Sequence, residues 1–229
     1  MFHKLTAIFK EYQQYFGTAK AVEGLALLAC KRTMNLTVLK CVKLPDVSEE
    51  SLKTNPRYQC RFLEESELLR FAEDPSLELN PAFIRSATVK GDRCYGILDG
   101  EVLASYGWYS TGVTEVFPGR SVSFNPNHVY MYKGFTHPQY RGQRLHAVGM
   151  GRALRAYRSQ GSQGILSFVE AQNFSSLKSC YRLGYEDIGA VFFFEGMKRS
   201  FRSPGCYEYD MELLWTGTEG AGEPSLAVR

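Results

Sequence analysis

The chain has 229 residues, 44% of them hydrophobic and 22% charged, and a formal net charge of +3. This length and hydrophobic content allow a full buried core, and so small a net charge gives no indication of nucleic-acid binding. Six cysteines lie scattered without a CxxC pair or the Cys/His spacing of a zinc site. This pattern predicts reduced thiols in a cytoplasmic protein and no bound metal.

The N-terminal region is basic and has a helical pattern. Residues 1–43 carry seven lysines or arginines against two acids, a net charge of +5, and the remainder carries −2. Apolar side chains recur every three or four residues from Phe2 to Phe16, which predicts an amphipathic helix that ends at Gly17. We expect residues 1–56 to form a helical extension and linker, which contacts the body, a second subunit or an anionic membrane surface through residues 1–43.

The rest of the chain is predicted to form one α/β (α+β) domain over residues 57–215, followed by a disordered tail over 216–229. Asp99-Gly100 separates two apolar runs and predicts a hairpin with a type I′ turn. A hairpin ahead of alternating helices and strands predicts a mixed sheet. Residues 110–127 are predicted to form a long loop, and long loops in compact domains are usually functional.

The segment around residue 140 has the pattern of a strand, a tight turn and a helix. A β-type run from Val129 to Thr136 is followed by a turn containing Arg141-Gly142, and a helical pattern then begins near Arg144. Such a turn exposes unpaired backbone N–H groups at the positive end of a helix dipole, which predicts a phosphate site. If the phosphates belong to coenzyme A, the site would position a thioester for acyl transfer.

Two motifs and the order of elements from about Arg57 to Leu214 resemble the GCN5-related N-acetyltransferase (GNAT) superfamily. The family's Arg/Gln-x-x-Gly-x-Gly/Ala motif corresponds to Arg141-Gly142-Gln143-Arg144-Leu145-His146. Its Asn…Tyr-x-x-x-Gly-Phe segment corresponds to Asn173-Phe-Ser-Ser-Leu-Lys-Ser-Cys-Tyr-Arg-Leu-Gly-Tyr. The resemblance implies a GNAT-like mixed, mostly antiparallel sheet that is splayed at its centre and flanked by helices, with an N-terminal helical extension added.

The resemblance also implies how acetyl-CoA would be bound as the acyl-donor cosubstrate. Backbone N–H groups of the first motif would hold the pyrophosphate, and the main chain at Phe135 and Thr136 would pair with the pantetheine arm. The amine would attack the thioester directly, without a covalent enzyme intermediate. The residues implied to bind the cosubstrate are Phe135, Thr136, Arg141, Gly142, Gln143, Arg144, Leu145, His146 and Asn173.

This sequence departs from the family pattern in the phosphate motif. Arg144 stands where the family has Gly, and His146 stands where it has Gly or Ala. The Arg144 side chain would either add a charge-assisted contact to the phosphates or crowd them. His146 would either pack in the first helical turn or take part in the chemistry.

The proton donor to the leaving thiolate is a second departure. The family's Tyr falls at Cys180, and Tyr181 lies one residue later on the same predicted helical face. Either side chain could approach the sulfur, or both could simply pack against the sheet. Tyr181 would be the better neutral donor, whereas Cys180 as an acyl carrier lacks a basic neighbour in the sequence.

The general base has several candidates. Glu170 ends the strand beside the cleft, and His128, Tyr130 and Tyr132 lie on or just before the neighbouring strand. A chain of water molecules could replace a single basic side chain.

Aromatic side chains are predicted to line the acceptor pocket. They are Tyr106, Trp108 and Tyr109, together with the loop over residues 110–127.

These features predict a cytoplasmic GNAT-type acyltransferase (N-acetyltransferase) that moves an acetyl group from acetyl-CoA to a primary amine of a small molecule. One alternative is an acyltransferase with a longer acyl donor, carried on CoA or on acyl carrier protein. Another is a GNAT-fold binding protein without catalytic activity, which the departures at Arg144, His146 and the tyrosine position would explain.

Overall fold

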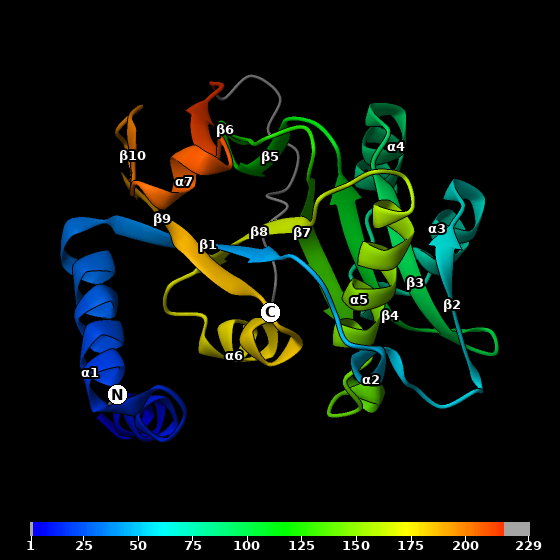
Figure 1. Ribbon diagram of the computed structural model, residues 1–229, viewed down its shortest axis with the longest axis horizontal. Helices are drawn as coiled ribbons and strands as arrows, with labels where there is room; N and C mark the ends of the chain where they lie inside the picture. The colour runs from blue at the N-terminus through cyan, green and yellow to red at the C-terminus, as the bar shows by residue number, and fades with distance from the viewer. Residues whose placement is uncertain (1, 218–229) are drawn as a thin grey trace.

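The structure is a computed structural model that describes residues 2–217 (Figure 1). The prediction of a disordered tail over 216–229 lies outside the described residues, apart from Thr216 and Gly217. The strands are β1 (Leu36–Leu44), β2 (Tyr58–Leu63), β3 (Arg93–Asp99), β4 (Val102–Ser110), β5 (Thr114–Phe117), β6 (Arg120–Ser123), β7 (Val129–Thr136), β8 (Ile165–Glu170), β9 (Glu186–Phe194), β10 (Ser200–Arg202) and β11 (Glu212–Trp215).

The described residues also form seven α-helices and two single-turn 3₁₀ helices. The α-helices are α1 (Phe2–Met34), α2 (Glu49–Leu52), α3 (Glu65–Phe71), α4 (Pro81–Lys90), α5 (Leu145–Arg158), α6 (Phe174–Leu183) and α7 (Gly205–Glu208). The 3₁₀ helices are η1 (Pro75–Leu77) and η2 (Pro138–Tyr140). No helix in the described part of the chain is both long enough and apolar enough to cross a membrane.

The main sheet has the strand order β10-β9-β1-β8-β7-β4-β3-β2, and a smaller sheet has the order β11-β6-β5. All pairings in the main sheet are antiparallel except that of β7 with β8. Buried side chains of α5 and α6 pack on one face of the main sheet, and those of α3, α4 and the small sheet pack on the other. This is the mixed, mostly antiparallel architecture flanked by helices that the resemblance implies.

The centre of the main sheet is splayed. The parallel strands β7 and β8 pair only at Val129↔Ile165 and Tyr130↔Leu166, near their first residues. Beyond these pairs the strands separate, and within residues 2–217 the edge of β7 that faces β8 has no strand partner. A backbone edge of this kind can pair with an extended ligand as a sheet edge pairs with a peptide.

A β-bulge lies in β7 next to the splay. Trp108 of β4 pairs with Lys133, and the next residue, Tyr109, pairs with Met131, so that Tyr132 has no residue opposite it. The bulge turns the side chains of Tyr132 and Lys133 toward the same face of the sheet. The Tyr132 hydroxyl donates to Asp92 Oδ2 at 2.7 Å, and its ring contacts Phe83. Lys133 Nζ lies 4.6 Å from the centroid of the same Phe83 ring. Bulges of this kind re-aim side chains beside functional sites.

The predicted domain boundary after residue 56 is wrong in one respect. Strand β1 lies inside the main sheet, where it pairs with β8 on one side and β9 on the other. Residues 36–44 therefore belong to the domain that was predicted to begin at residue 57. The local sequence carried no signal for the partners of β1, because these lie more than 120 residues away along the chain.

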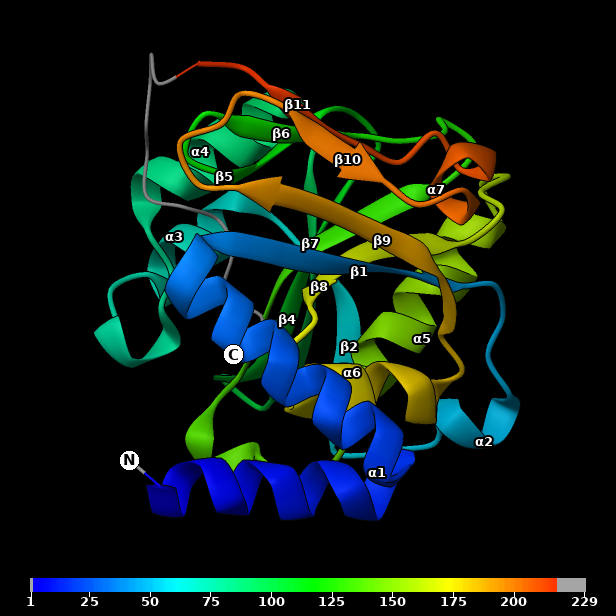
Figure 2. The same ribbon diagram turned by 90° about the vertical axis from the view of Figure 1, so that its left-hand side faces the viewer.

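The N-terminal helix bends where the sequence predicted. Gly17 has φ 81° and ψ 167° and separates two helical parts that meet at an angle (Figure 2). The second part packs beside β1, with Leu27 against a small cluster that contains Val38 and Ala190. Contact of residues 1–43 with a membrane or a second subunit stays a prediction.

Two turn predictions need correction. The β3–β4 hairpin forms, but its two-residue loop is Gly100-Glu101, because Asp99 pairs with Val102 and has no positive φ. The prediction of a type I′ turn centred on Asp99-Gly100 is therefore wrong. Residues 110–127 are not a single long loop, because they contain the β5–β6 hairpin, which joins the small sheet.

Candidate functional site

A cavity of about 450 Å³ lies where β7 and β8 separate. Its walls are formed by β7, β8, the turn after β7, the first turns of α5 and one face of α6. The volume falls within the range of small-molecule sites. The splay of the sheet thus produces a hollow in the interior, bordered on one side by the unpaired edge of β7.

One end of the cavity is the turn that the sequence singled out. Gly142 has φ 81° and Arg144 has φ 59°, and α5 begins immediately afterwards at Leu145. Arg144 is the N-cap residue, and its side chain makes no capping hydrogen bond. The first N–H groups of α5 therefore remain for an anion.

Four cations line the cavity. Arg141 and Arg144 come from the turn, and Lys178 and Arg182 come from α6, where they are four residues apart and share a face. None of the described residues that line the cavity is acidic. The guanidinium groups of Arg141 and Arg144 at the turn suit a negatively charged ligand.

Sequence reasoning missed the two α6 cations. Lys178 and Arg182 lie inside the second motif, and their spacing of four residues placed both on one helical face. That spacing was a usable signal. Which way the face points could be learned only from the packing of α6 on the sheet.

Phe135 and Thr136 line the cavity at the end of β7. The carbonyl oxygen of Phe135 accepts a hydrogen bond from Ser105 Oγ of β4 at 2.8 Å, and that of Thr136 accepts one from Arg141 Nε at 3.3 Å. Each of these two carbonyls therefore has a partner in the described chain, which limits how this end of β7 could pair with a pantetheine arm.

Two residues predicted to bind the cosubstrate do not line the cavity. Gln143 Oε1 accepts a hydrogen bond from the Tyr58 hydroxyl at 2.6 Å, which ties the turn to β2. Asn173 is the N-cap of α6, where its Oδ1 accepts from the Ser176 N–H at 3.3 Å. Both side chains therefore fix the position of elements that form the cavity.

His146 lies in the wall of the cavity, in the first turn of α5, and packs against Gly134 of β7. Only a glycine fits at position 134, because a Cβ there would overlap His146 Cε1. Desolvation of the half-buried imidazole lowers the pKa of His146 from 6.5 to about 4. The imidazole is therefore neutral at pH 7.

We expect His146 to make the protein acid-sensitive. Because its folded pKa of about 4 lies below the ordinary 6.5, its contribution to stability is complete above pH 6.5 and is lost as the pH falls toward 4. The loss amounts to at most about 3 kcal/mol. Urea unfolding at pH 7.5 and pH 4.5 should show a smaller acid-induced loss for His146→Gln than for the wild type. An equal loss in both proteins would contradict this assignment. Burial also lowers the pKa of His128, but this affects both proteins alike.

The structure separates the two candidates for the proton donor. Cys180 is buried and lines the cavity, and burial raises the pKa of its thiol to about 12. Tyr181 does not line the cavity, and its hydroxyl lies 3.5 Å from Asp187 Oδ2 at the start of β9. Of the two residues, only Cys180 lines the cavity, and its thiol is neutral there.

Glu170, the predicted base at the end of β8, lies outside the cavity lining. Its carboxylate forms an ion pair with Lys31 of α1, at 2.7 Å between Nζ and Oε2, and accepts a hydrogen bond from Gln172 Nε2 at 2.6 Å. Both contacts hold the carboxylate outside the cavity. The long-range contact with α1 could not be read from the local sequence.

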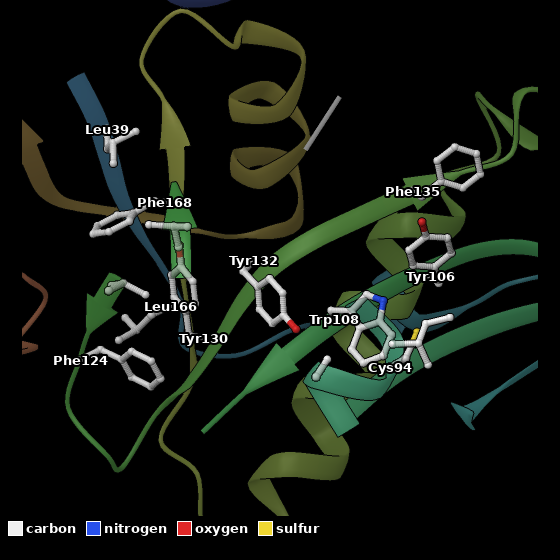
Figure 3. Packing of buried hydrophobic residues seen from close by; sticks show 14 of the residues in the cluster. Leu39, Cys94, Tyr106, Trp108, Phe124, Tyr130, Tyr132, Phe135, Leu166 and Phe168 are labelled. Carbon is white, nitrogen blue, oxygen red and sulfur yellow. The ribbon is translucent and has the colours of Figure 1, made fainter. Parts of the chain in front are cut away.

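The other predicted bases and the aromatic residues of the predicted acceptor pocket lie in the core rather than in the cavity. Their side chains are buried, and Figure 3 shows several of them packed together on the sheet. The Tyr106 hydroxyl donates to the Leu77 carbonyl at 2.9 Å, which fixes η1 on the sheet. These residues outside the cavity lining are Tyr106, Trp108, Tyr109, His128, Tyr130 and Tyr132.

Within the described residues, no group of three or more His, Cys, Asp or Glu side chains is placed to hold a metal ion.

No protein-family model and no curated protein sequence matches the chain. The structure is similar to solved structures at low sequence identity. An acetyltransferase of the GNAT family from Colwellia psychrerythraea has 10% identity and a TM-score of 0.49, and the alignment covers 73% of this chain and 56% of that one. A protein from Novosphingobium aromaticivorans, assigned to the same family of acetyltransferases, has 17% identity and a TM-score of 0.45, with 69% and 62% covered.

A third similar structure contains a ligand. It is yncA from Salmonella typhimurium, provisionally named an acetyltransferase and solved with its cofactor acetyl-CoA, with 14% identity, a TM-score of 0.42, and 73% of this chain and 98% of that one covered. The chain spans less than two thirds of the length of the Colwellia and Novosphingobium proteins.

Proposed function

We propose that the protein is a GNAT-type N-acyltransferase that moves an acetyl group from acetyl-CoA to the primary amine of a small molecule. The observation that carries the proposal is the cavity between the separated ends of β7 and β8, with the N-terminus of α5 and the turn residues Arg141 and Arg144 in its lining. A site of this shape suits a ligand with several phosphates and a long, nearly neutral arm.

Different residues would bind different parts of the cosubstrate. The turn from Arg141 to Leu145 would hold the pyrophosphate through backbone N–H groups and the guanidinium of Arg144. Lys178 and Arg182 would face the remaining phosphate charge. The unpaired edge of β7 would align the pantetheine arm, which would place the thioester in the inner cavity near Cys180.

Acyl transfer needs an amine that has lost its proton and a donor that protonates the departing thiolate. The Cys180 thiol would supply that proton, because it lies in the cavity and burial keeps it neutral. Glu170 is paired with Lys31, so we expect the amine to lose its proton to water. The reaction would take place in the cytoplasm, where thiols stay reduced.

Cys180 and Tyr181 give a direct test of this assignment. We expect Cys180→Ala to lower kcat about 100-fold, the low end of what a positioned acid contributes, and to change KM for acetyl-CoA little. Tyr181→Phe should keep kcat within about twofold, because its hydroxyl faces Asp187. Steady-state release of free CoA, measured with a thiol reagent, checks both. A loss in the Tyr181 variant alone would overturn the assignment.

The proposed function is tested by binding and by turnover. Isothermal titration should detect acetyl-CoA, and a panel of small primary amines should release free CoA. Absence of binding at millimolar acetyl-CoA would refute the proposal. Binding without turnover would favour the inactive binding protein, and a preference for longer acyl-CoA or acyl carrier protein would favour the longer donor.

A further inference from the structure

Two cysteines outside the cavity lie in direct contact in the core. Cys41 is in β1 and Cys206 is in α7, and their sulfur atoms are 3.2 Å apart although the residues are 165 positions apart in the chain. Both side chains are fully buried. A rotation that brings the two sulfurs about 1 Å closer would reach the length of a disulfide bond.

The surroundings of the pair differ for the two thiols, which indicates which one ionises more easily. The Cys206 sulfur also lies 3.5 Å from the Ala190 carbonyl and 3.8 Å from Ser203 Oγ. The hydrogen bond between the two sulfurs is the main cause that lowers the pKa of Cys206 to about 7. Burial raises the pKa of Cys41, so the shared proton stays on Cys41. Cys206 is therefore the nucleophile and Cys41 the resolving thiol.

We propose that Cys41 and Cys206 form a peroxide-sensitive dithiol that closes to an intramolecular disulfide. The Cys206 thiolate attacks one oxygen of hydrogen peroxide, which forms a sulfenic acid and releases hydroxide. The Cys41 sulfur then attacks the Cys206 sulfur, its proton leaves with the sulfenic oxygen, and water is released. The hydroxide takes up the proton that Cys206 lost on ionising, so in sum two thiols are oxidised to a disulfide and one peroxide is reduced to two waters.

The fold explains both access to this pair and the effect of closing it. Cys206 lies in a four-residue helix whose next residue, Tyr207, is 58% exposed, so local opening of α7 admits a small oxidant. The disulfide would join the C-terminal segment to β1, which pairs with the splayed strand β8. The other buried thiols are poorer targets, because burial raises the pKa of Cys94 and Cys180.

The test is peptide mapping of the full-length protein after brief treatment with hydrogen peroxide and blocking of the remaining thiols. We expect a Cys41–Cys206 cross-linked peptide that dithiothreitol releases, and a rise in Tm of roughly 5–10 °C. Cys206→Ser and Cys41→Ser should lack the cross-link, and the matched variant Cys60→Ser should keep it.

Two results would overturn the proposal. One is oxidation of wild-type Cys206 to sulfinic acid with no cross-link to Cys41. The other is faster oxidation of Cys60 or Cys180 than of this pair. Both are read from the wild-type protein, so the test stands even if a variant fails to fold. Neither depends on the proposed acyltransferase activity.

Discussion

Arg144→Glu is expected to weaken acetyl-CoA binding about 100-fold, which corresponds to about 2.7 kcal/mol. Arg144 is the N-cap of α5 and lines the cavity, so the substitution would remove the proposed charge-assisted contact and place a negative charge where the phosphates are proposed to bind. Isothermal titration with acetyl-CoA measures the change. Arg85→Glu, on the exposed surface of α4, makes the same change in net charge away from the cavity and should leave affinity unaltered.

Arg144→Gly separates the charge of this residue from its backbone. Arg144 has φ 59°, a left-handed conformation that costs a non-glycine residue about 1 kcal/mol, and glycine restores the residue of the family motif. The greater freedom of glycine in the unfolded chain offsets this gain by about 0.5–1 kcal/mol. We therefore expect nearly unchanged stability and binding that is about 10-fold weaker. Tighter binding would show that the side chain crowds the phosphates.

Gly134→Ala is expected to lower the free energy of unfolding by about 1–3 kcal/mol and to abolish most acetyl-CoA binding. The added Cβ would overlap His146 Cε1 and approach Met131 Cε at 2.8 Å. His146 cannot move away without shifting the first turn of α5 or entering the cavity. Urea unfolding and isothermal titration measure the two effects.

A double-mutant cycle identifies the cause of this loss. If the clash with the imidazole is responsible, Gly134→Ala should cost little in a His146→Ala background, with a coupling energy of about 1–2 kcal/mol. Gly112→Ala is the matched control, because a Cβ at Gly112 meets no atom within 4 Å. Equal costs of Gly134→Ala in both backgrounds would remove His146 from the explanation.

Local patterns in the sequence were enough to predict many elements and the turn at one end of the cavity. Periodicity placed the kink at Gly17 and a helix after Arg144, and the Asp-Gly pair predicted the β3–β4 hairpin. These features depend on residues within a few positions of one another. The turn before α5 belongs with them, since a strand, a turn and a helix follow in sequence.

The tertiary structure alone decided which side chains enter the site. Cys180 and Tyr181 are neighbours in sequence, and only the packing of α6 on the sheet turns Cys180 inward. Glu170 is paired with Lys31, which lies 139 residues away, and β1 enters the sheet through pairings that no local pattern encodes. Each of these outcomes depends on the relative placement of segments far apart in the chain. The physical reason is that periodicity and turn chemistry act over a few residues, whereas burial, pairing and pKa depend on what packs against each side chain.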